Sequence, residues 1–397
     1  MLDEIVVSGM GSISGIGNNL DETLQSCLQM KCAIKELQHI KSIHKLPCAE
    51  VSYTDAEMKA ILNIADSETA TRTALMGMIA TQEALNNAKI TNDSKYRIAF
   101  LNGTTVGGME KSEMYYFDFL ENDKFNHYIE AHDCGACTEK IADYFGCFSY
   151  VGTPSTACSS AANAIMLGAE LIRNGEVDIV VAGGSECITK FHLNGFNSLM
   201  ILDKEICRPF DETRAGLNLG EGAAYIVIES SKLAEKRKIK PLCKLSGYGN
   251  ACDAYHQTAS SPDGDGAVIA MTNALETSGI EPKDIDYINA HGTGTPNNDE
   301  SEGKAIARVF LEKIPYISST KSITGHTTSA AGGVESVISI LSLNNRFVPG
   351  NYNFKTQMSC LPFKPVSEVI TNVDLKHVLS NSFGFGGNNS SLVFSKI

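Results

Sequence analysis

The sequence lacks two features that would send the chain into or across a membrane. It has no uncharged apolar run of membrane-spanning length, and its first residues include acids where a secretory signal would need basic side chains. It also lacks a cluster of lysines and arginines with interleaved aromatic residues, and its formal net charge is −13. We therefore expect a soluble, cytoplasmic protein with neither a membrane nor a nucleic acid as its partner.

A disulfide framework is also absent, although the chain has twelve cysteines. The cysteines are scattered along a long chain without a secretory signal, a context in which thiols usually stay reduced and serve as small core residues. Cys134 and Cys137 form a Cys-x-x-Cys motif, which can indicate redox chemistry or half of a zinc site. No second pair with suitable spacing completes a tetrahedral set, so the sequence predicts no metal.

The pattern that is present is that of an α/β protein. The 397 residues are 43% hydrophobic and 20% charged, and short apolar runs alternate with amphipathic segments of helical length. Strands are predicted over residues 4–9, 97–102, 178–182, 223–229, 243–247, 285–290, 316–319, 378–382 and 391–395.

The two halves of the chain resemble each other in four segments that recur in the same order. The matched pairs are 4–11 with 243–249, 84–105 with 274–293, 155–162 with 323–331, and 178–184 with 378–387. An ordered set of matches indicates a duplication, with an N-terminal half over 1–240 and a C-terminal half over 241–397. Pseudo-twofold symmetry would place equivalent helix starts face to face and would bring Cys158 and His326 together in one cleft.

Cys158 is the first candidate for chemistry. It follows a predicted strand-to-loop passage and begins an alanine-rich helix that is predicted to run to about Arg173. A thiol at a helix N-terminus meets unpaired N–H groups and the positive end of the helix dipole, so its thiolate is expected to be favoured. A buried structural cysteine is the alternative interpretation, and it is the starting interpretation for the other eleven.

Two histidines lie in glycine-rich contexts. His291 follows an apolar run, so it is expected to project from the end of a strand, and the hydroxyls of Thr293 and Thr295 could bind amide groups. From the local pattern alone, a loop histidine beside a turn glycine fits equally well. His326 precedes a predicted helix, where a neutral imidazole can donate a hydrogen bond to a developing oxyanion or simply cap the helix.

Four motifs, taken together, favour a catalytic role for Cys158, His291 and His326 over the structural alternatives. They are Ser-Thr-Ala-Cys-Ser-Ser, Asn-Ala-His-Gly-Thr-Gly-Thr, Ser-Thr-Lys-Ser-Ile-Thr-Gly-His and Asn-Ser-Phe-Gly-Phe-Gly-Gly-Asn-Asn. They resemble the motifs of the β-ketoacyl synthases, especially the elongating 3-oxoacyl-acyl-carrier-protein synthases of the second type, and the resemblance runs from residue 4 to residue 395. It implies a thiolase-like fold, in which two pseudo-twofold-related α/β halves form five layers. It also implies an acyltransferase that forms a homodimer, or a heterodimer with a synthase-like subunit.

The resemblance further implies a reaction, a decarboxylative Claisen condensation of an acyl thioester with malonyl-acyl-carrier protein. Cys158 would be acylated, with its oxyanion held by the backbone N–H groups of Cys158 and Phe385. His291 and His326 would polarise the malonyl thioester carbonyl while carbon dioxide leaves. The substrates would be carried on the phosphopantetheine of the carrier protein, and no other cofactor is implied.

Supporting roles follow from the same resemblance. Lys321 and Glu335 match a buried pair that orients the histidines, although a charge pair on a helix face explains Glu335 equally well. Phe383 and Phe385 match a gate between the thiol and the acyl pocket, although either could be a core aromatic. Together with Thr293 and Thr295, which would bind pantetheine, these residues complete the predicted site.

Three alternatives stay open beside this interpretation. A biosynthetic thiolase shares the fold, but it uses a second, C-terminal cysteine where this chain reads Phe383-Gly-Phe385. An initiating synthase of the third type pairs cysteine with histidine and asparagine, and the second histidine argues against it. A chain-length-factor-like subunit, which is not an enzyme, lacks the nucleophile that Cys158 would supply.

Some segments depart from the family pattern. The chain reads Ala215 and Leu217 where many elongating synthases have aspartate and phenylalanine, and residues 127–137 replace a common pocket segment. A helix around Asp66 to Arg72, often basic for carrier-protein docking, is partly acidic here, so Lys124 and Lys204 become the docking candidates. The acyl chain length and the pathway, whether fatty-acid elongation or a dedicated polyketide or polyene pathway, stay open.

Overall fold

The computed structural model describes residues 3–40, 42–65, 67–91 and 95–397. A ten-stranded sheet runs through the molecule in the order β3-β2-β4-β5-β1-β6-β12-β11-β7-β8. Its strands are β1 (Ile5–Ser14), β2 (Ile98–Gly103), β3 (Tyr150–Gly152), β4 (Ile179–Glu186), β5 (Gly222–Ser230), β6 (Cys243–Cys252), β7 (Tyr287–Asn289), β8 (Tyr316–Ser318), β11 (His377–Gly384) and β12 (Asn388–Ser395). All nine predicted strands are present. A small second sheet pairs β9 (Phe347–Val348) with β10 (Ile370–Thr371), which are too short to leave a pattern in the sequence.

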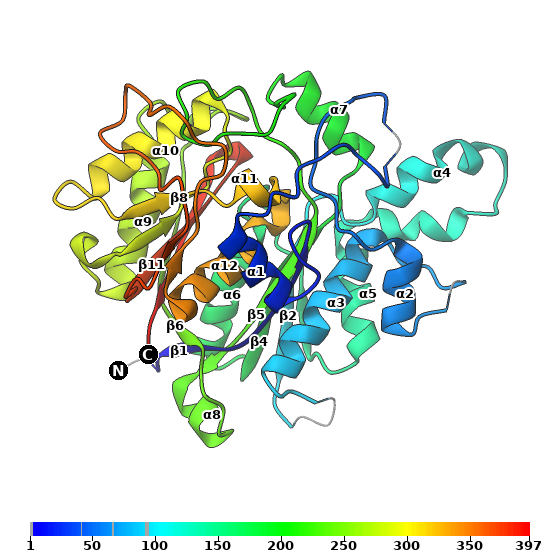
Figure 1. The fold of residues 1–397 in the computed structure, drawn as a ribbon. Helices are drawn as coiled ribbons and strands as arrows, with labels where there is room; N and C mark the ends of the chain where they lie inside the picture. Colours follow the sequence, from blue (N-terminus) through cyan, green and yellow to red (C-terminus); the bar gives the residue numbers. More distant parts are fainter. Residues whose placement is uncertain (1–2, 41, 66, 92–94) are drawn as a thin grey trace.

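Helices lie between and outside the two halves of this sheet (Figure 1). They are α1 (Leu20–Gln29), α2 (Asp55–Leu62), α3 (Arg72–Asn87), α4 (Met109–Glu121), α5 (Cys134–Phe145), α6 (Ser160–Arg173), α7 (Lys190–Ser198), α8 (Ser231–Lys236), α9 (Asp265–Ser278), α10 (Pro296–Val309), α11 (Lys321–Thr324) and α12 (Ala331–Asn345). α3 and α9 cover the outer faces of the two half-sheets, and α6 and α12 pack between the halves. The predicted five layers of a thiolase-like fold are therefore confirmed.

The strand order repeats itself on either side of the junction between β1 and β6. β1 pairs antiparallel with β5 as β6 does with β12, and β2 pairs parallel with β4 as β7 does with β11. Among the described residues, the two half-sheets are joined by the pairing of Val6 with Lys244 and of Val7 with Cys243. This topology confirms the predicted pseudo-twofold halves. The boundary at residue 240 stays a prediction, and it falls in the link between α8 and β6.

A shared packing contact explains why the two strand–glycine segments look alike. A Cβ on Gly11 of β1 would overlap the backbone oxygen of Ala80 in α3, and a Cβ on Gly249 of β6 would overlap that of Ala270 in α9. Each helix thus rests directly on the backbone of the first strand in its half, an approach that only glycine permits. The sequence repeat therefore has a steric cause.

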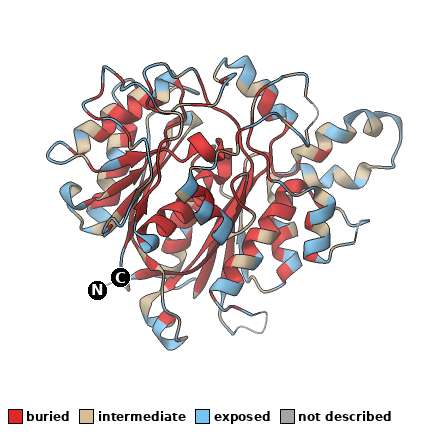
Figure 2. Cartoon of the chain, viewed as in Figure 1, coloured by how far each residue is buried: buried red, intermediate tan, exposed pale blue. Residues whose placement is uncertain are grey.

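The centre of the molecule is the most buried part, and exposed residues gather on the outer helices (Figure 2). α12 is buried on every side from Ala331 to Leu343. This explains why its sequence is rich in small and apolar residues and has no polar face. No helix in the described residues combines the length and the apolarity needed to cross a membrane.

The predicted docking helix around Asp66 to Arg72 is wrong. Residues 67–71 form a turn and an extended segment, and Thr71 caps α3 by accepting the N–H of Ala74. Arg72 opens α3 with only 5% of its surface exposed and donates hydrogen bonds to Glu221 and Asp55. A guanidinium held in a buried ion pair is not available to a carrier protein, and Asp66 lies outside the described residues.

Candidate active site

The loop that carries Cys158 makes a sharp turn between β3 and α6. Ala157 has a φ of +53°, which is uncommon for a residue with a side chain. The turn is held by Ser160, whose hydroxyl donates to the carbonyl of Ala157 at 2.6 Å and accepts the N–H of Thr156 at 2.9 Å. Cys158 is consequently fixed two residues before the first residue of α6 and is 6% exposed.

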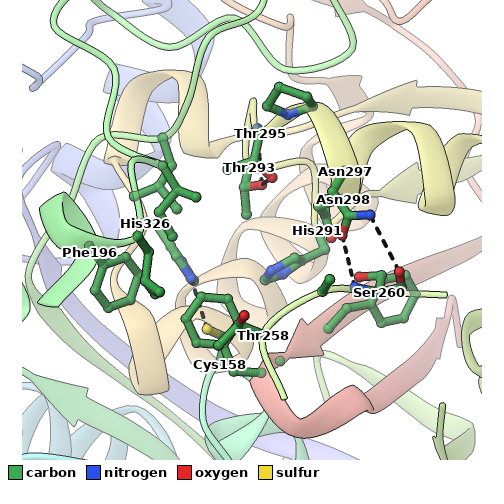
Figure 3. Close-up of a pocket in the computed structure, with 18 of the residues that line it drawn as sticks. Cys158, Phe196, Thr258, Ser260, His291, Thr293, Thr295, Asn297, Asn298 and His326 are labelled. Carbon is green, nitrogen blue, oxygen red and sulfur yellow. Dashed lines mark hydrogen bonds between the residues drawn. The ribbon is translucent and has the colours of Figure 1, made fainter. Parts of the chain in front are cut away.

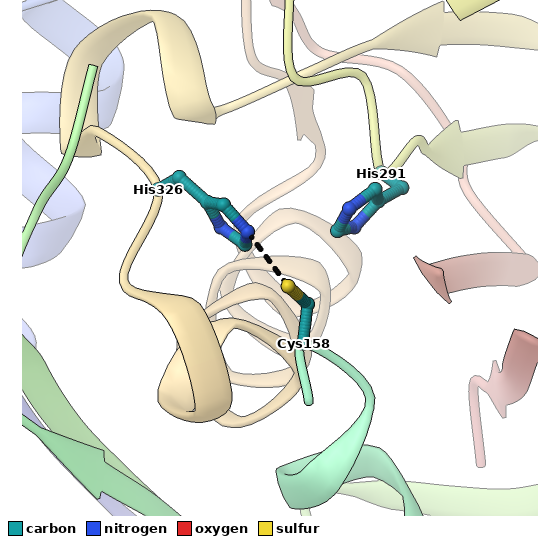
Figure 4. Close-up of side chains that lie close together, drawn as sticks. All are labelled: Cys158, His291 and His326. Atoms are coloured by element: carbon teal, nitrogen blue, oxygen red, sulfur yellow. Dashed lines mark hydrogen bonds between the residues drawn. The ribbon is translucent and has the colours of Figure 1, made fainter. Parts of the chain in front are cut away.

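Cys158 and His326 meet in the cleft between the halves, as the symmetry of the sequence predicted (Figure 4). The Sγ atom of Cys158 lies 3.0 Å from Nε2 of His326. His326 precedes α12 as Cys158 precedes α6, although a short 3₁₀ turn, Thr328–Ala330, separates it from the helix. Equivalent positions in the two halves therefore supply two different groups to one site.

His291 completes the cluster from the loop after β7. Its ring centroid lies 5.3 Å from that of His326, with the two rings nearly perpendicular, and 6.0 Å from that of Phe383. The sulfur of Cys158 and one nitrogen of each histidine lie within 4.8 Å of one another. Cysteine and histidine can also bind zinc, so the absence of a metal stays a prediction from the sequence.

Lys321 and Glu335 lie behind the histidines, at 1% and 2% exposure. The Lys321 ammonium forms an ion pair with Glu335 and lies 3.3 Å from Nδ1 of His291. An ammonium has donors only, so Nδ1 must accept, and the proton of the neutral ring is placed on Nε2. The predicted supporting pair therefore contacts His291 directly, and it does so through Lys321.

Burial sets the protonation of the cluster. It holds the pKa of both His291 and His326 well below the usual range, and the Lys321 charge lowers each further. Burial likewise raises the pKa of Cys158 to about 11, although Lys321 and the backbone N–H groups of Phe385 and Cys158 act in the opposite direction. The prediction of a favoured thiolate is therefore wrong for the free protein, because desolvation outweighs the helix terminus. The histidines are neutral as predicted, with burial as the main cause.

Glu302 of α10 positions His291, and sequence reasoning missed it. Its carboxylate accepts the N–H groups of His291 and Gly292 at 2.8 and 2.7 Å and an amide N–H of Asn381 at 3.1 Å. Burial raises the pKa of Glu302 to about 7. Asp299, three residues earlier, similarly accepts the N–H of Gly294 at 3.1 Å. Two acids one helical turn apart, just after the histidine motif, were an available signal.

A cavity of about 360 Å³ opens onto the cluster (Figure 3). Thr293 and Thr295 line it with hydroxyls 2.9 Å apart, and Phe383 and Phe385 line it near Cys158. Phe196 of α7, which the sequence did not single out, stacks on Phe385 with a centroid distance of 5.7 Å. All the predicted pantetheine and gate residues thus share one cavity with the three chemical groups.

Of the residues that depart from the family pattern, some line this cavity and others do not. Leu217 lines it, whereas Ala215 is exposed. Residues 127–137 do not line it, and their part in an acyl pocket stays a prediction. In that segment Cys134 donates through its thiol to the carbonyl of Thr105 and Cys137 is buried, and both thiols are free.

Solved structures define the class of protein to which this fold and site belong. The chain superposes over its full length on the ishigamide ketosynthase/chain length factor, with a TM-score of 0.93 and 27% identity. It also matches a ketosynthase, ApeO, in complex with its chain length factor from Xenorhabdus doucetiae, with a TM-score of 0.87, 28% identity and 98% of that chain covered. The fold is thus that of the thiolase-like ketosynthases.

The family follows from the sequence comparisons. Models of the beta-ketoacyl synthase N-terminal and C-terminal domains match residues 2–234 and 242–355. The chain is 33% identical to 3-oxoacyl-[acyl-carrier-protein] synthase 2 of Staphylococcus aureus, over 99% of this chain and 98% of the relative. It is 31% identical to the protein of the same name from Vibrio harveyi, with the same coverage. This chain belongs to the β-ketoacyl synthase family.

Proposed function

We propose that this chain condenses an acyl thioester with malonyl-acyl-carrier protein and forms 3-oxoacyl-acyl-carrier protein with loss of carbon dioxide. The observation that carries the proposal is the buried cluster of Cys158, His291 and His326, which faces one cavity. The names of the relatives, 3-oxoacyl-[acyl-carrier-protein] synthase 2, support the carrier protein as the partner. Fatty-acid elongation and a dedicated polyketide or polyene pathway both use this reaction.

The first step is acylation of Cys158. Its sulfur attacks the thioester carbonyl, and the thiol of the carrier protein leaves with the proton that Cys158 gives up. The Nε2–H of His326, 3.0 Å from the sulfur, is placed to donate a hydrogen bond that stabilises the thiolate as it forms. The backbone N–H groups of Cys158 and Phe385, which both favour the thiolate, would donate to the oxyanion of the tetrahedral intermediate.

The second step is decarboxylation of the malonyl group. The thioester carbonyl gains negative charge as carbon dioxide leaves, and two neutral imidazoles can donate Nε2–H groups to that oxygen. Lys321 fixes the proton of His291 on Nε2, and Glu335 holds Lys321 in place. The carbanion then attacks the carbonyl of acyl-Cys158, a new carbon–carbon bond forms, and the Cys158 sulfur is released. Donors that are already oriented in a buried site need little reorganisation.

A second synthase-like chain completes the proposal as the dimer partner. The edge strand β3 exposes Tyr150 and Val151, and α4 exposes Met114, Phe117 and Leu120. An unpaired strand edge and exposed apolar side chains are each typical of a surface that another chain covers. The partner is a second copy or a chain-length-factor-like subunit. A cytoplasmic location and the lack of a resident cofactor or metal belong to the same proposal.

Intact-protein mass spectrometry tests this function directly. The purified chain is mixed with a panel of acyl-carrier proteins and then with malonyl-carrier protein, alone and with a candidate partner subunit. We expect an acyl mass increment at Cys158 that disappears as 3-oxoacyl-carrier protein forms. The proposal would be contradicted if an acyl-carrier protein of the panel acylated a residue other than Cys158. It would also be contradicted if no member of the panel acylated the chain. Release of the acyl group by acetyl-CoA without malonyl-carrier protein would favour the thiolase alternative.

A further inference from the structure

The two backbone donors near Cys158 belong to different halves of the molecule. The Cys158 N–H lies in the N-terminal half, and the Phe385 N–H lies in the loop after β11 in the C-terminal half. The loops touch, because a Cβ on Gly384 would lie 3.0 Å from the nitrogen of Cys158. An oxyanion hole with one donor from each half requires a contact that fixes the separation and direction of the two loops.

Apolar packing alone does not fix the separation and direction of the two loops, because the loop after β11 contains two residues with great backbone freedom. Gly386 and Gly387 have φ values of +80° and +76°, a region that glycine enters easily. They lie between Phe385 and Asn388, the first residue of β12. The position of Phe385 therefore depends on how its chain is anchored, at Asn388 as well as through the backbone hydrogen bonds of Gly386 and Gly387.

Asn388 is anchored by a network of amides and hydroxyls that crosses the boundary between the halves. Its Oδ1 lies 2.8 Å from the hydroxyl of Ser159, 2.9 Å from the amide nitrogen of Asn163 and 2.9 Å from that of Asn250. Ser159 directly follows Cys158, and Asn163 lies one turn later in α6. One oxygen thus accepts amide donors from α6 and β6, and it lies beside the Ser159 hydroxyl, which also lies 2.7 Å from the carbonyl of Thr156 in the nucleophile loop.

The other atoms of the network are also engaged. Asn163 donates to the hydroxyl of Thr156 at 2.8 Å, and its own oxygen accepts the hydroxyl of Ser390 at 2.8 Å. Asn250 also lies 3.0 Å from that hydroxyl. The residue before the strained Ala157 turn and the residue after Cys158 are therefore tied to β12. Connected hydrogen bonds of this kind restrict direction as well as distance.

We infer that Asn388, with Ser159, Asn163 and Asn250, sets the geometry of the oxyanion hole by joining the Cys158 loop to the Phe385 loop. Asn388 is a positioning residue, since it acts through two backbone N–H groups and faces three protein donors. The inference rests on the proposed function, because the oxyanion arises only if Cys158 attacks a thioester. Neither the motifs nor the symmetry of the sequence indicated this role.

Two reactions of the same sulfur separate positioning from general damage. Acylation by a thioester passes through a tetrahedral oxyanion, whereas alkylation by iodoacetamide displaces iodide and forms none. Both rates are measured at the Cys158 peptide by mass spectrometry, using the acyl-carrier protein that acylates the wild-type chain. We expect Asn388→Ala to slow acylation by about tenfold, short of the roughly hundredfold cost of losing a donor outright. Its alkylation rate should stay near that of the wild-type chain.

Matched variants make the test specific. Asn388→Asp keeps an oxygen for all three donors and should recover part of the acylation rate. Asn345→Ala removes an amide that donates to Leu341 at the far end of α12, and it should change neither rate. If Asn388→Ala does not fold, Asn250→Ala removes one donor from the exposed side of the network and should still slow acylation selectively.

The measurements distinguish failure of the proposed function from failure of the positioning role of Asn388. A wild-type chain that no acyl-carrier protein acylates would defeat the proposed function itself. Normal acylation by wild type and by Asn388→Ala, or equal slowing of acylation and alkylation in that variant, would overturn the positioning role while leaving the condensing reaction intact. Lack of any recovery in Asn388→Asp would count against Oδ1 as the contributing atom.

Discussion

The two halves of the molecule share a scaffold and differ in what they place on it. Each has five strands in the same order and a helix that lies on the glycines of its first strand. At the equivalent helix start, however, one half has Cys158 and the other has His326. After the equivalent strands β2 and β7, one half has the Thr104 and Thr105 hydroxyls bonded to Glu186, and the other has His291. The cleft therefore forms between two equivalent scaffolds, and the reactive groups in it come from positions where the two halves carry different side chains.

The halves also differ in the segment between the two outermost strands of each half-sheet. In the N-terminal half, residues 104–149 lie between β2 and β3 and contain α4 and α5. In the C-terminal half, residues 290–315 lie between β7 and β8 and contain only α10. The longer insertion carries the exposed apolar side chains of α4, whereas α10 supplies Glu302 to the site. The insertion of one half therefore exposes apolar side chains, and that of the other half supplies a carboxylate that holds the His291 loop.

The largest expected effect is loss of the group that only the N-terminal half provides. Cys158→Ala should abolish condensation and preserve the fold, because a smaller side chain fits the turn. Cys158→Gln places an amide where the acyl thioester would be and should raise carbon dioxide release from malonyl-carrier protein. Condensation is followed by mass spectrometry and carbon dioxide release by coupled assay. Continued chain extension by Cys158→Ala would show that the nucleophile is misassigned.

The second prediction compares the two histidines of the C-terminal half. His291→Ala and His326→Ala should each lower decarboxylation by about a hundredfold or more, because each removes a donor from the developing enolate. Acylation of Cys158 should survive in His291→Ala and slow in His326→Ala, because only His326 contacts the sulfur. Separate assays of acylation and of carbon dioxide release check this. Equal loss of acylation in both variants would refute the different roles assigned here to His291 and His326.

The pH dependence of the two half-reactions should differ in the same way. The thiol of Cys158 has a pKa of about 11, so the acylation rate should rise with pH from neutrality toward that value. The histidine pKa values lie well below 6.5, so both rings stay neutral from about pH 6 to 8 and should themselves give decarboxylation no pH dependence in that range. Decarboxylation can be measured alone in Cys158→Gln. A fall in its rate below pH 7 would report protonation of Glu302 or Glu335, both with a pKa of about 7, or of a histidine.

A stability comparison tests the shared scaffold. Gly11→Ala and Gly249→Ala each force a methyl group against a helix backbone, so each should destabilise the protein by about 1–3 kcal/mol. Gly195→Ala, in the middle of α7 with no atom within 4 Å of the new Cβ, should be neutral or slightly stabilising. Denaturant midpoints measure all three. A large effect in one half alone would show that the two strand–helix contacts are not equivalent.

The smallest expected effects concern carrier-protein docking to the N-terminal half. Lys124→Glu and Lys204→Glu should slow acyl transfer a few-fold at low salt and less at high salt, because exposed charges steer association. Lys283→Glu, an exposed control in the C-terminal half, should leave the rate unchanged. Competition between a dedicated and a housekeeping carrier protein for Cys158 identifies the pathway. Preference for the housekeeping protein, unaffected by either lysine change, would refute a dedicated pathway.

The sequence by itself determined the duplication, the strands and the three chemical groups. Strand–glycine segments repeat because a strand that lies against a helix backbone needs glycine, and that requirement is visible in one dimension. Cys158 and His326 were expected to meet because equivalent helix starts face each other under pseudo-twofold symmetry. Such features depend on local composition and order, which the chain displays directly.

Only the tertiary structure decided the protonation and the orientation of those groups. The helix start predicted a thiolate at Cys158, but burial by both halves makes the thiol the stable form. The proton of His291 is directed by Lys321, thirty residues away, and its loop is held by Glu302. A helix was expected around Asp66 to Arg72, but α3 begins only at Arg72, which the fold buries against Glu221. Desolvation and contacts between distant residues arise only when the halves close on each other, so the local pattern at Cys158 and His291 gave neither the protonated thiol nor the direction of the His291 proton.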